Sequence, residues 1–380
     1  MKNFTNKATD GTSMRALCAQ ILRGDMAQMQ TDAFLSDEAF WKRAWREGVG
    51  ACVWHELQKQ DVGVDASIRE LCIEEPLRSQ IAHTLMLRAV ATEVLRQFAG
   101  AGIDVVMLRG QAVADVLYSP PTLRPQVDID LLIRENDVQQ VSDMLAKAGF
   151  SCLPHHSLLF RRGEVLLDMH TEPLGIERIA SWALLTPLRA DAIFEHAHQG
   201  SLLGVDALLT NDALQLPYLS FHAMKHSFER LLWLWDIALL ARKIGEADTW
   251  GNLQTGIELY ALQRPCFYAL SYVDAHLAAP VPASLLDALR PDMDWRERQM
   301  FRRFMQHETV PFLAERVFSR MQPDFMHRMA FWKETIWPRA EVRAQIDDDT
   351  SPSSFSGKRL KQISVAGLML LREMGALFRR

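Results

Sequence analysis

Cysteine is scarce in this sequence and does not cluster. Five cysteines are spread over 380 residues, and no two of them have Cys-X-X-Cys spacing. This distribution argues against a cysteine-based zinc site and against a disulfide framework. Because thiols stay reduced in the cytosol, we expect a cytoplasmic protein.

Long apolar runs are also missing. No uncharged apolar stretch reaches about 18 residues, the length at which a membrane-spanning helix becomes a candidate, and the N-terminal segment MKNFTNKATDGTSMRAL lacks the apolar run of a secretory signal peptide. Acidic and basic residues nearly balance, with a net charge of −5. A balanced chain has no overall attraction to nucleic acid or to anionic membranes, so we expect neither as a general partner.

Helical spacing dominates both ends of the chain. Apolar residues recur at intervals of three and four from residue 12 to residue 100, as in Met14, Leu17 and Ile21. Residues 246–340 are also helical in pattern. We therefore predict an N-terminal helical region and a C-terminal helical domain, at residues 1–98 and 209–346.

The pattern changes in the segment between them, residues 99–208. The run IDVVML after Gly102 is rich in β-branched residues and predicts a short strand. Arg109-Gly110 ends it, and helical spacing resumes. A glycine at a strand-to-helix turn lets backbone N–H groups approach a phosphate, although a simple tight turn explains one glycine equally well.

Further along, the run VDIDLLI predicts a second strand, with Val127, Ile129 and Leu131 pointing into a core. A helix follows and is expected to end before Gly149. The segments SLLFRR and EVLLDMH then predict a hairpin. Together these elements form a small mixed α/β unit.

Two aspartates, Asp128 and Asp130, lie two residues apart in the second predicted strand. Side chains alternate along a strand, so both point to one face. Their like charges repel and call for a cation between them, and oxygen ligands suit Mg²⁺. By the same alternation Asp168, in the second arm of the hairpin, shares a face with His170. The alternative is a chance pairing on a half-exposed strand.

Three carboxylates on one small unit suit phosphoryl or nucleotidyl transfer. These reactions need positioning and charge neutralisation more than covalent chemistry, and divalent ions can hold the attacking and leaving oxygens in line. We predict Asp128, Asp130 and Asp168 as catalytic residues and as ligands of Mg²⁺ or Mn²⁺. Asp168 is also the candidate to draw the proton from an attacking hydroxyl.

The segments MLRGQAV, VDIDLLI and VLLDMH, with Tyr118 and Arg124 between the first two, resemble the pattern LKG…R…GDIDLLV…LDLH. This pattern is that of an uncharacterised bacterial nucleotidyltransferase family, a divergent branch of the polymerase-β-like superfamily. The resemblance covers roughly residues 30–245. It implies an α+β fold, with a small mixed-sheet nucleotidyltransferase core at 99–208 flanked by the N-terminal and C-terminal helical regions.

The resemblance also implies roles for single residues. Gly110 would lie under the triphosphate, and Arg109 and Arg124 would contact its phosphates. The sequence departs from the pattern at three places: Arg109 replaces the usual lysine, which keeps the charge but changes the geometry, Val127 replaces the glycine before the acidic pair, and Gln111 replaces the superfamily's serine.

A second signature follows the predicted core. Thr210-Asn211-Asp212 predicts the start of one long helix through ALQLPYLSFHAMKHSFERLLWLWDIALLARK, which Pro217 could kink. On a helical wheel its polar stripe spans about 140° and contains His222, Lys225, His226, Glu229, Arg230, Trp233 and Asp236. The stripe resembles the family pattern H…KH…RL.WL.DI. We expect it to face the three carboxylates across a cleft.

Within that stripe, Lys225, His226 and Arg230 are predicted to bind the triphosphate. The spacing of His222 and His226 also suits a metal pair, but the glutamate of the zincin motif is absent because Ala223 stands in its place. An ordinary solvated helix face is the alternative.

Residues 347–380 form the last predicted unit, an acidic and serine-rich linker followed by a basic amphipathic tail from Lys358. A tail of this kind can lie on an anionic membrane, dock on a partner or pack on its own domain.

These patterns predict an enzyme that moves a nucleoside monophosphate from a nucleoside triphosphate, with ATP the expected donor. Relatives of the family resemble accessory enzymes of biosynthetic pathways, which favours a small-molecule or peptide acceptor, and no basic groove with interleaved aromatic residues indicates nucleic acid. Two alternatives stay open: a non-catalytic nucleotide-binding or interaction module, motivated by the Gly110-Gln111 turn, and a kinase-like transfer of the γ-phosphate.

Overall fold

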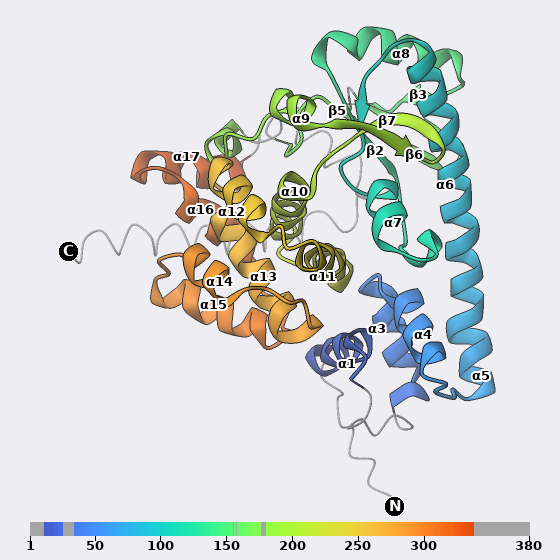
Figure 1. Cartoon of the computed structure of the whole chain (residues 1–380), viewed down its shortest axis with the longest axis vertical. Coiled ribbons are helices and arrows are strands. Elements are labelled where there is room, and N and C mark those ends of the chain that lie inside the picture. Colours follow the sequence, from blue (N-terminus) through green and yellow to red (C-terminus); the bar gives the residue numbers. More distant parts are fainter. Residues whose placement is uncertain (1–10, 26–33, 155, 157, 176–179, 338–380) are drawn as a thin grey trace, which may run out of the picture.

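The computed structural model describes residues 11–25, 34–154, 156, 158–175 and 180–337. In this part of the chain a seven-stranded mixed sheet packs among helices (Figure 1). The strands are β1 (Val105–Val106), β2 (Ile129–Ile133), β3 (Ser151–Cys152), β4 (Leu159–Arg162), β5 (Val165–His170), β6 (His198–Leu202) and β7 (Val205–Leu209). The predicted linker and tail at 347–380 lie outside the described residues.

The helices before the sheet are α1 (Gly11–Arg23), α3 (Glu38–Arg46), α4 (Gly50–Lys59), α5 (Ala66–Ile68) and the long α6 (Glu75–Gly100). Those between the strands are α7 (Gln111–Leu117), α8 (Val138–Lys147) and α9 (Ala190–His196). Those that follow are α10 (Asp212–Lys225), α11 (Leu231–Glu246), α12 (Trp250–Leu259), α13 (Gln263–Leu277), α14 (Ala283–Leu289), α15 (Trp295–Met305), α16 (Leu313–Met321) and α17 (Phe325–Ile336). No helix in the described ranges combines the length and the apolar character that crossing a membrane requires.

The strand order is β3-β4-β5-β2-β1-β7-β6. β2 lies near the middle, parallel to β5 and antiparallel to β1. β4 and β5 form the predicted hairpin, and β6 and β7 form a second hairpin at the other edge. The expectation of an α+β fold with a mixed sheet between helical flanks is confirmed.

Alternate residues of β2 face two different cores. Ile129, Leu131 and Ile133 pack with apolar side chains of α6 and α8, and Figure 1 shows α6 running along that side of the sheet. Leu132 belongs to the larger core formed by the other helices. Asp130 has the same parity as Leu132, so its side chain points to the face of the sheet opposite α6 and α8.

The prediction that Val127 points into the core is wrong. Val127 is 65% exposed, because β2 begins only at Ile129 and the two residues before it form a bend. Alternation therefore does not extend back to Val127, whereas Ile129 and Leu131 are buried as expected.

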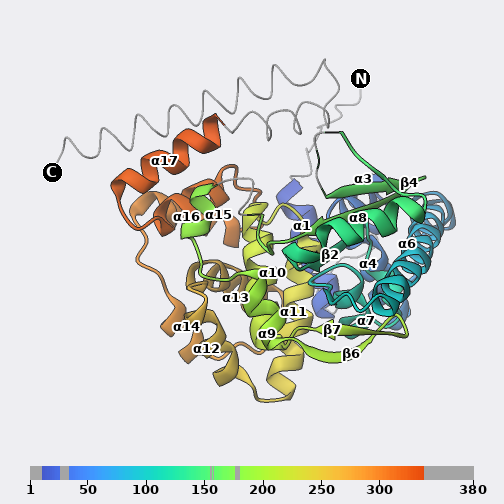
Figure 2. The ribbon, with the colours of Figure 1, turned by 90° about the horizontal axis from the view of Figure 1, so that it is seen from above.

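The N-terminal and C-terminal helices share one core. Cys18 of α1 and Trp41 of α3 belong to the same buried cluster as Leu240 of α11 and Phe267 of α13. In Figure 2, α10 and α11 lie between the sheet and the remaining C-terminal helices. The two helices that carry the second signature are thus held from both sides, while the predicted domain boundaries stay a prediction.

The single long helix predicted after the sheet is wrong, because α10 and α11 are separated by residues 226–230. Ser227 and Phe228 have left-handed backbone conformations, with φ of 51° and 52°, and the N–H of Phe228 donates to the carbonyl of Ala223 at 2.8 Å. The Phe228 side chain is buried, with its ring 4.8 Å from that of Phe304. Burial of this phenylalanine stabilises a break that helical periodicity does not reveal. Pro217 is accommodated inside α10.

Candidate functional site

A cavity of about 850 Å³ lies between the sheet and the break between α10 and α11. Residues of β2, β5 and the loops around them line one wall, and residues of α10, the break and α11 line the other. The predicted site residues that line it are Arg109, Gly110, Arg124, Asp128, Asp130, Asp168, Lys225, His226 and Arg230. The two sequence signatures therefore meet in one place.

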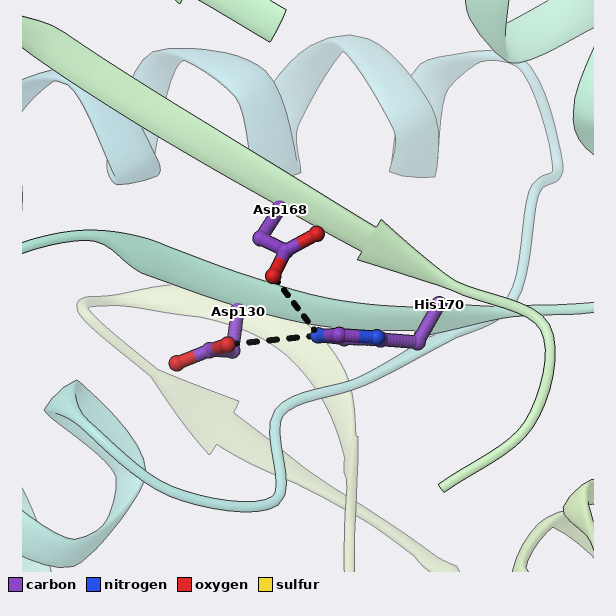
Figure 3. Close-up of side chains that lie close together, drawn as sticks. All are labelled: Asp130, Asp168 and His170. Atoms are coloured by element: carbon purple, nitrogen blue, oxygen red, sulfur yellow. Dashed lines mark hydrogen bonds and ion pairs between the residues drawn. The ribbon is translucent and has the colours of Figure 1, made fainter. Parts of the chain in front are cut away.

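The pairing of β2 with β5 places Asp130 directly beside Asp168. The strands are parallel, and the two carboxylates emerge on the same face together with the ring of His170 (Figure 3). Nε2 of His170 lies 3.3 Å from Oδ1 of Asp130 and 3.4 Å from Oδ2 of Asp168. Among the described residues these three side chains form a group that could hold a metal ion, with their ligand atoms within 4.8 Å of one another.

Asp128 lies in the bend before β2 and lines the same cavity, but it is not part of that group. Burial, and next the negative charge of Asp130, raise the pKa of Asp128 to about 6. Asp128 is therefore electrostatically coupled to the other carboxylates. The predicted residues Asp128, Asp130 and Asp168 all line one cavity. His170 lies close to Asp130 and Asp168 within it.

The charges around Asp130 favour its ionised form. Burial opposes ionisation, but the positive charge of Arg109 and the hydrogen bond from His170 outweigh it and hold the pKa of Asp130 well below its usual range. For His170, burial again opposes the charged form, while the hydrogen bond to Asp130 and the charge of Asp168 raise its pKa. The cluster is thus organised around a carboxylate that stays negative.

The donor atoms of this cluster fit a divalent cation. Asp130 and Asp168 offer the carboxylate oxygens that Mg²⁺ and Mn²⁺ prefer, and His170 offers a nitrogen or orients the two carboxylates. Gln126 gives a further indication of a ligand. It is 7% exposed and lines the cavity, and neither atom of its amide has a hydrogen-bond partner among the described residues. Buried amides normally make hydrogen bonds, so the amide of Gln126 is available to bond a ligand in this cavity.

Arg109 links the two walls. Its Nη2 donates to Oδ1 of Asp130, and its Nη1 lies 2.8 Å from Nδ1 of His222 on α10. Burial and then the charge of Arg109 lower the pKa of His222 far below its usual value, so this histidine is neutral and accepts the hydrogen bond. Arg109 is therefore a half-buried cation that joins the two walls of the cavity.

Gly110 forms the predicted turn between β1 and α7. Its φ of 63° and ψ of −117° are accessible mainly to glycine. A Cβ atom at this position would meet nothing within 4 Å, so the requirement comes from the backbone and not from crowding. The turn is confirmed, while contact with a triphosphate stays a prediction.

Arg124 lines the cavity, but it is held by another residue. Its Nε and Nη2 donate to Asp236 of α11 at 3.0 and 2.8 Å, and the hydroxyl of Tyr118 donates to the same carboxylate at 2.6 Å. All three side chains are buried. This arrangement attaches the loop before β2 to α11. The predicted phosphate contact of Arg124 would require that pair to open.

Lys225, His226 and Arg230 lie on the wall opposite the carboxylates, as expected. Nζ of Lys225 lies 5.1 Å from the centre of the Trp182 ring, and the guanidinium of Arg230 lies 6.0 Å from the ring of Trp233. Because the helix breaks at 226–230, His226 and Arg230 belong to the break and not to a continuous stripe.

Three functional candidates were not assigned from the sequence. His170 shares the parity of Asp168, and that alternation was the signal that could have found it. His222 and Asp236 belong to the polar stripe, but their partners Arg109 and Arg124 lie more than 100 positions away in the chain. Contacts at that separation leave no trace in local spacing.

The sequence profile of a family described as uncharacterised nucleotidyltransferases matches residues 35–278. The match spans more than half of the chain and contains every residue of the site described above. No curated protein and no solved structure matches the chain. The chain belongs to the family of uncharacterised nucleotidyltransferases.

Proposed function

We propose that this protein is a metal-dependent nucleotidyltransferase. It moves a nucleoside monophosphate from a nucleoside triphosphate, with ATP the expected donor, to a small-molecule or peptide acceptor. The observation that carries the proposal is the pairing of Asp130 with Asp168 across parallel strands, in a cavity whose opposite wall carries Lys225 and Arg230. Membership in the nucleotidyltransferase family supports the reaction class.

Asp130 and Asp168 would hold a divalent ion, with Asp128 and His170 in the same cavity. Bound Mg²⁺ or Mn²⁺ would neutralise charge on the phosphoryl oxygens and align the reacting groups. In the proposed reaction an acceptor oxygen forms a bond to the α-phosphorus, the bond from that phosphorus to the β-phosphate bridging oxygen breaks, and pyrophosphate leaves with the electron pair.

The chain's own side chains serve the rest of the reaction. Arg109, Lys225 and Arg230 supply positive charge for the triphosphate. Asp168 is half-buried and less enclosed than Asp130, so it is the better placed carboxylate to accept the proton of the acceptor hydroxyl. We place the protein in the cytoplasm, in keeping with the free thiols of all five cysteines.

A specific observation also favours the non-catalytic alternative. Gln111 is 1% exposed, and neither atom of its amide has a hydrogen-bond partner among the described residues. It stands where the superfamily carries a serine, so this turn offers the triphosphate no hydroxyl. A nucleotide-binding module without turnover would tolerate that loss.

Product analysis separates these functions. The protein is incubated with ATP, Mg²⁺ or Mn²⁺, and a panel of small molecules and peptides that carry hydroxyl groups. We expect metal-dependent release of pyrophosphate and an adduct heavier by one nucleoside monophosphate. ADP would instead select the kinase-like alternative, and metal-dependent ATP binding without any product would select the module. No metal-dependent binding of ATP would contradict both the enzyme and the module.

A further inference from the structure

Three aromatic side chains stand together on the helical wall of the cavity. The ring centres of His222 and His226 lie 5.0 Å apart, and that of Trp233 lies 5.5 Å from His222 and 5.0 Å from His226. All three line the cavity that contains the carboxylates. We call His222, His226 and Trp233 the ring wall.

The exposure of Trp233 is unusual for its position. Its neighbours Leu232, Leu234 and Trp235 are 3%, 0% and 5% exposed and belong to the helical core. Trp233 is only partly buried: it packs against that core and also lines the cavity. Part of the indole packs against His222 and His226, and the remaining surface that faces the cavity is available to a ligand.

The ring wall begins one side chain away from the carboxylates. Arg109 donates to Asp130 with one nitrogen and lies 2.8 Å from His222 with another. The ring of His222 in turn touches that of Trp233. A ligand whose phosphates lie near Arg109 and Asp130 therefore has the ring wall within reach of its next chemical group.

The rings and the neighbouring cations of the ring wall suit a ligand in which a planar group is attached to an anion. The low pKa of His222, caused by burial and then by Arg109, keeps this ring uncharged. Two cations lie near these rings. The guanidinium carbon of Arg230 is 6.0 Å from the centre of the Trp233 ring, and Lys225 lines the same wall. A nucleobase joined through its ribose to phosphates has both properties.

We propose that the ring wall is the subsite for the nucleobase of the triphosphate, with Trp233 as its stacking surface. This inference rests on the proposed function, because it assumes that a nucleotide occupies the cavity. Stacking accepts any base, since every base has a π face. Because stacking by itself carries no hydrogen-bond readout, the affinities for ATP, GTP, CTP and UTP should differ by less than about tenfold.

Calorimetry with two ligands tests the subsite in the full chain. Mg²⁺–ATP carries a base, whereas Mg²⁺–tripolyphosphate has the phosphates alone. Stacking on an aromatic side chain is worth about 1–3 kcal/mol per base, so Trp233→Ala should weaken ATP binding about 5- to 150-fold. Tripolyphosphate binding should change less than about twofold, because the phosphates do not touch the indole. Trp233→Phe should restore most of the ATP affinity, and Trp295→Ala, at a tryptophan that is 64% exposed on α15, is the matched control.

A second measurement needs no variant. The triphosphate of 2-aminopurine riboside loses fluorescence when its base stacks, so binding to the native protein should quench it. Unchanged ATP affinity in Trp233→Ala, equal weakening of both ligands, or binding without quenching would each overturn the subsite. Failure of the proposed function looks different: the native protein would not bind Mg²⁺–tripolyphosphate at all, or Asp130→Asn would leave that binding unchanged.

Discussion

Arg109 and Asp130 form a hydrogen-bonded ion pair in the lining of the cavity, so a side chain predicted to bind phosphate neutralises one predicted to bind metal. An incoming divalent ion must compete with this guanidinium for the carboxylate. A triphosphate would give Arg109 a second anionic partner. Metal and nucleotide should therefore bind with positive cooperativity.

Replacement of Arg109 with glutamine tests this competition. We expect Arg109→Gln to bind Mn²⁺ about tenfold more tightly than the native protein when no nucleotide is present, because removal of the competing cation is worth about 1.4 kcal/mol. Arg109→Lys keeps the charge and should stay near the native value. Titration followed by the electron paramagnetic resonance of free Mn²⁺ gives both affinities, and unchanged or weaker Mn²⁺ binding by Arg109→Gln would refute the competition.

The carboxylates themselves are tested by Asp130→Asn and Asp168→Asn. Each change removes the charge of a predicted metal ligand but keeps its shape, so pyrophosphate release should fall at least about 100-fold while the fold is retained. Asp206→Asn, at an exposed carboxylate on β7, is the control and should keep full activity. Activity within about threefold of native in either site variant would remove that residue from the catalytic set.

His170 is the residue that the structure adds to the predicted metal set. Whether it ligates the metal or orients the two carboxylates, its loss should weaken Mn²⁺ binding about 10- to 100-fold. The measurement is Mn²⁺ affinity in His170→Ala compared with His198→Ala, at an exposed histidine on β6. Equal affinities in the two variants would show that His170 takes no part.

Arg124 and Asp236 form a buried ion pair that attaches the loop before β2 to α11. Asp236→Ala leaves Arg124 buried without its partner, which should lower the free energy of unfolding by about 3–5 kcal/mol. The double variant Arg124→Met/Asp236→Leu removes both charges and should lose less. Urea unfolding monitored by circular dichroism measures each value. A double variant less stable than Asp236→Ala would contradict a cost that arises from the unpaired charge.

A pair of half-buried histidines, His276 on α13 and His307 just after α15, predicts a pH effect away from the cavity. Nδ1 of His307 lies 2.8 Å from the hydroxyl of Tyr272, and its ring centre lies 4.2 Å from that of His276. Burial, then the charges of His276 and Arg15, lower the pKa of His307 to about 4. An unfolded histidine has a pKa of about 6.5, so between these values the unfolded state binds a proton that the folded state does not.

The free energy of unfolding should therefore fall as the pH drops from about 6.5 toward 4. His307→Gln removes this titration, so its stability should decline less steeply than that of the native protein over the same range. Urea unfolding at a series of pH values gives both slopes. Parallel slopes would show that His307 titrates normally in the folded protein.

The orientation of Asp130 and Asp168 and the hairpin were predictable because their signal is local. Strand alternation assigns Asp130 and Asp168 to defined faces, and burial of Leu131 and Leu167 on the opposite face fixes their orientation. Alternation does not extend to Val127, because the point at which a strand begins depends on pairing with its neighbours and not on the side chains of the strand alone.

The helical wall of the cavity could be predicted only in part. Its polar residues were found by periodicity, but the break at 226–230 was not, because the left-handed positions there are held by Ser227 and Phe228 and not by glycine. Burial of Phe228 and a hydrogen bond from Arg15 to its carbonyl stabilise that break. That hydrogen bond joins segments more than 200 residues apart, which no local pattern reveals.

The central claim is that Asp130 and Asp168 together hold a divalent cation for a triphosphate. Anomalous diffraction from crystals soaked with Mn²⁺ and a non-hydrolysable ATP analogue tests it directly. We predict a manganese peak about 2.0–2.3 Å from carboxylate oxygens of both aspartates, with the analogue's phosphates beside it. A peak coordinated by neither aspartate, or bound analogue with no peak between them, would contradict the account.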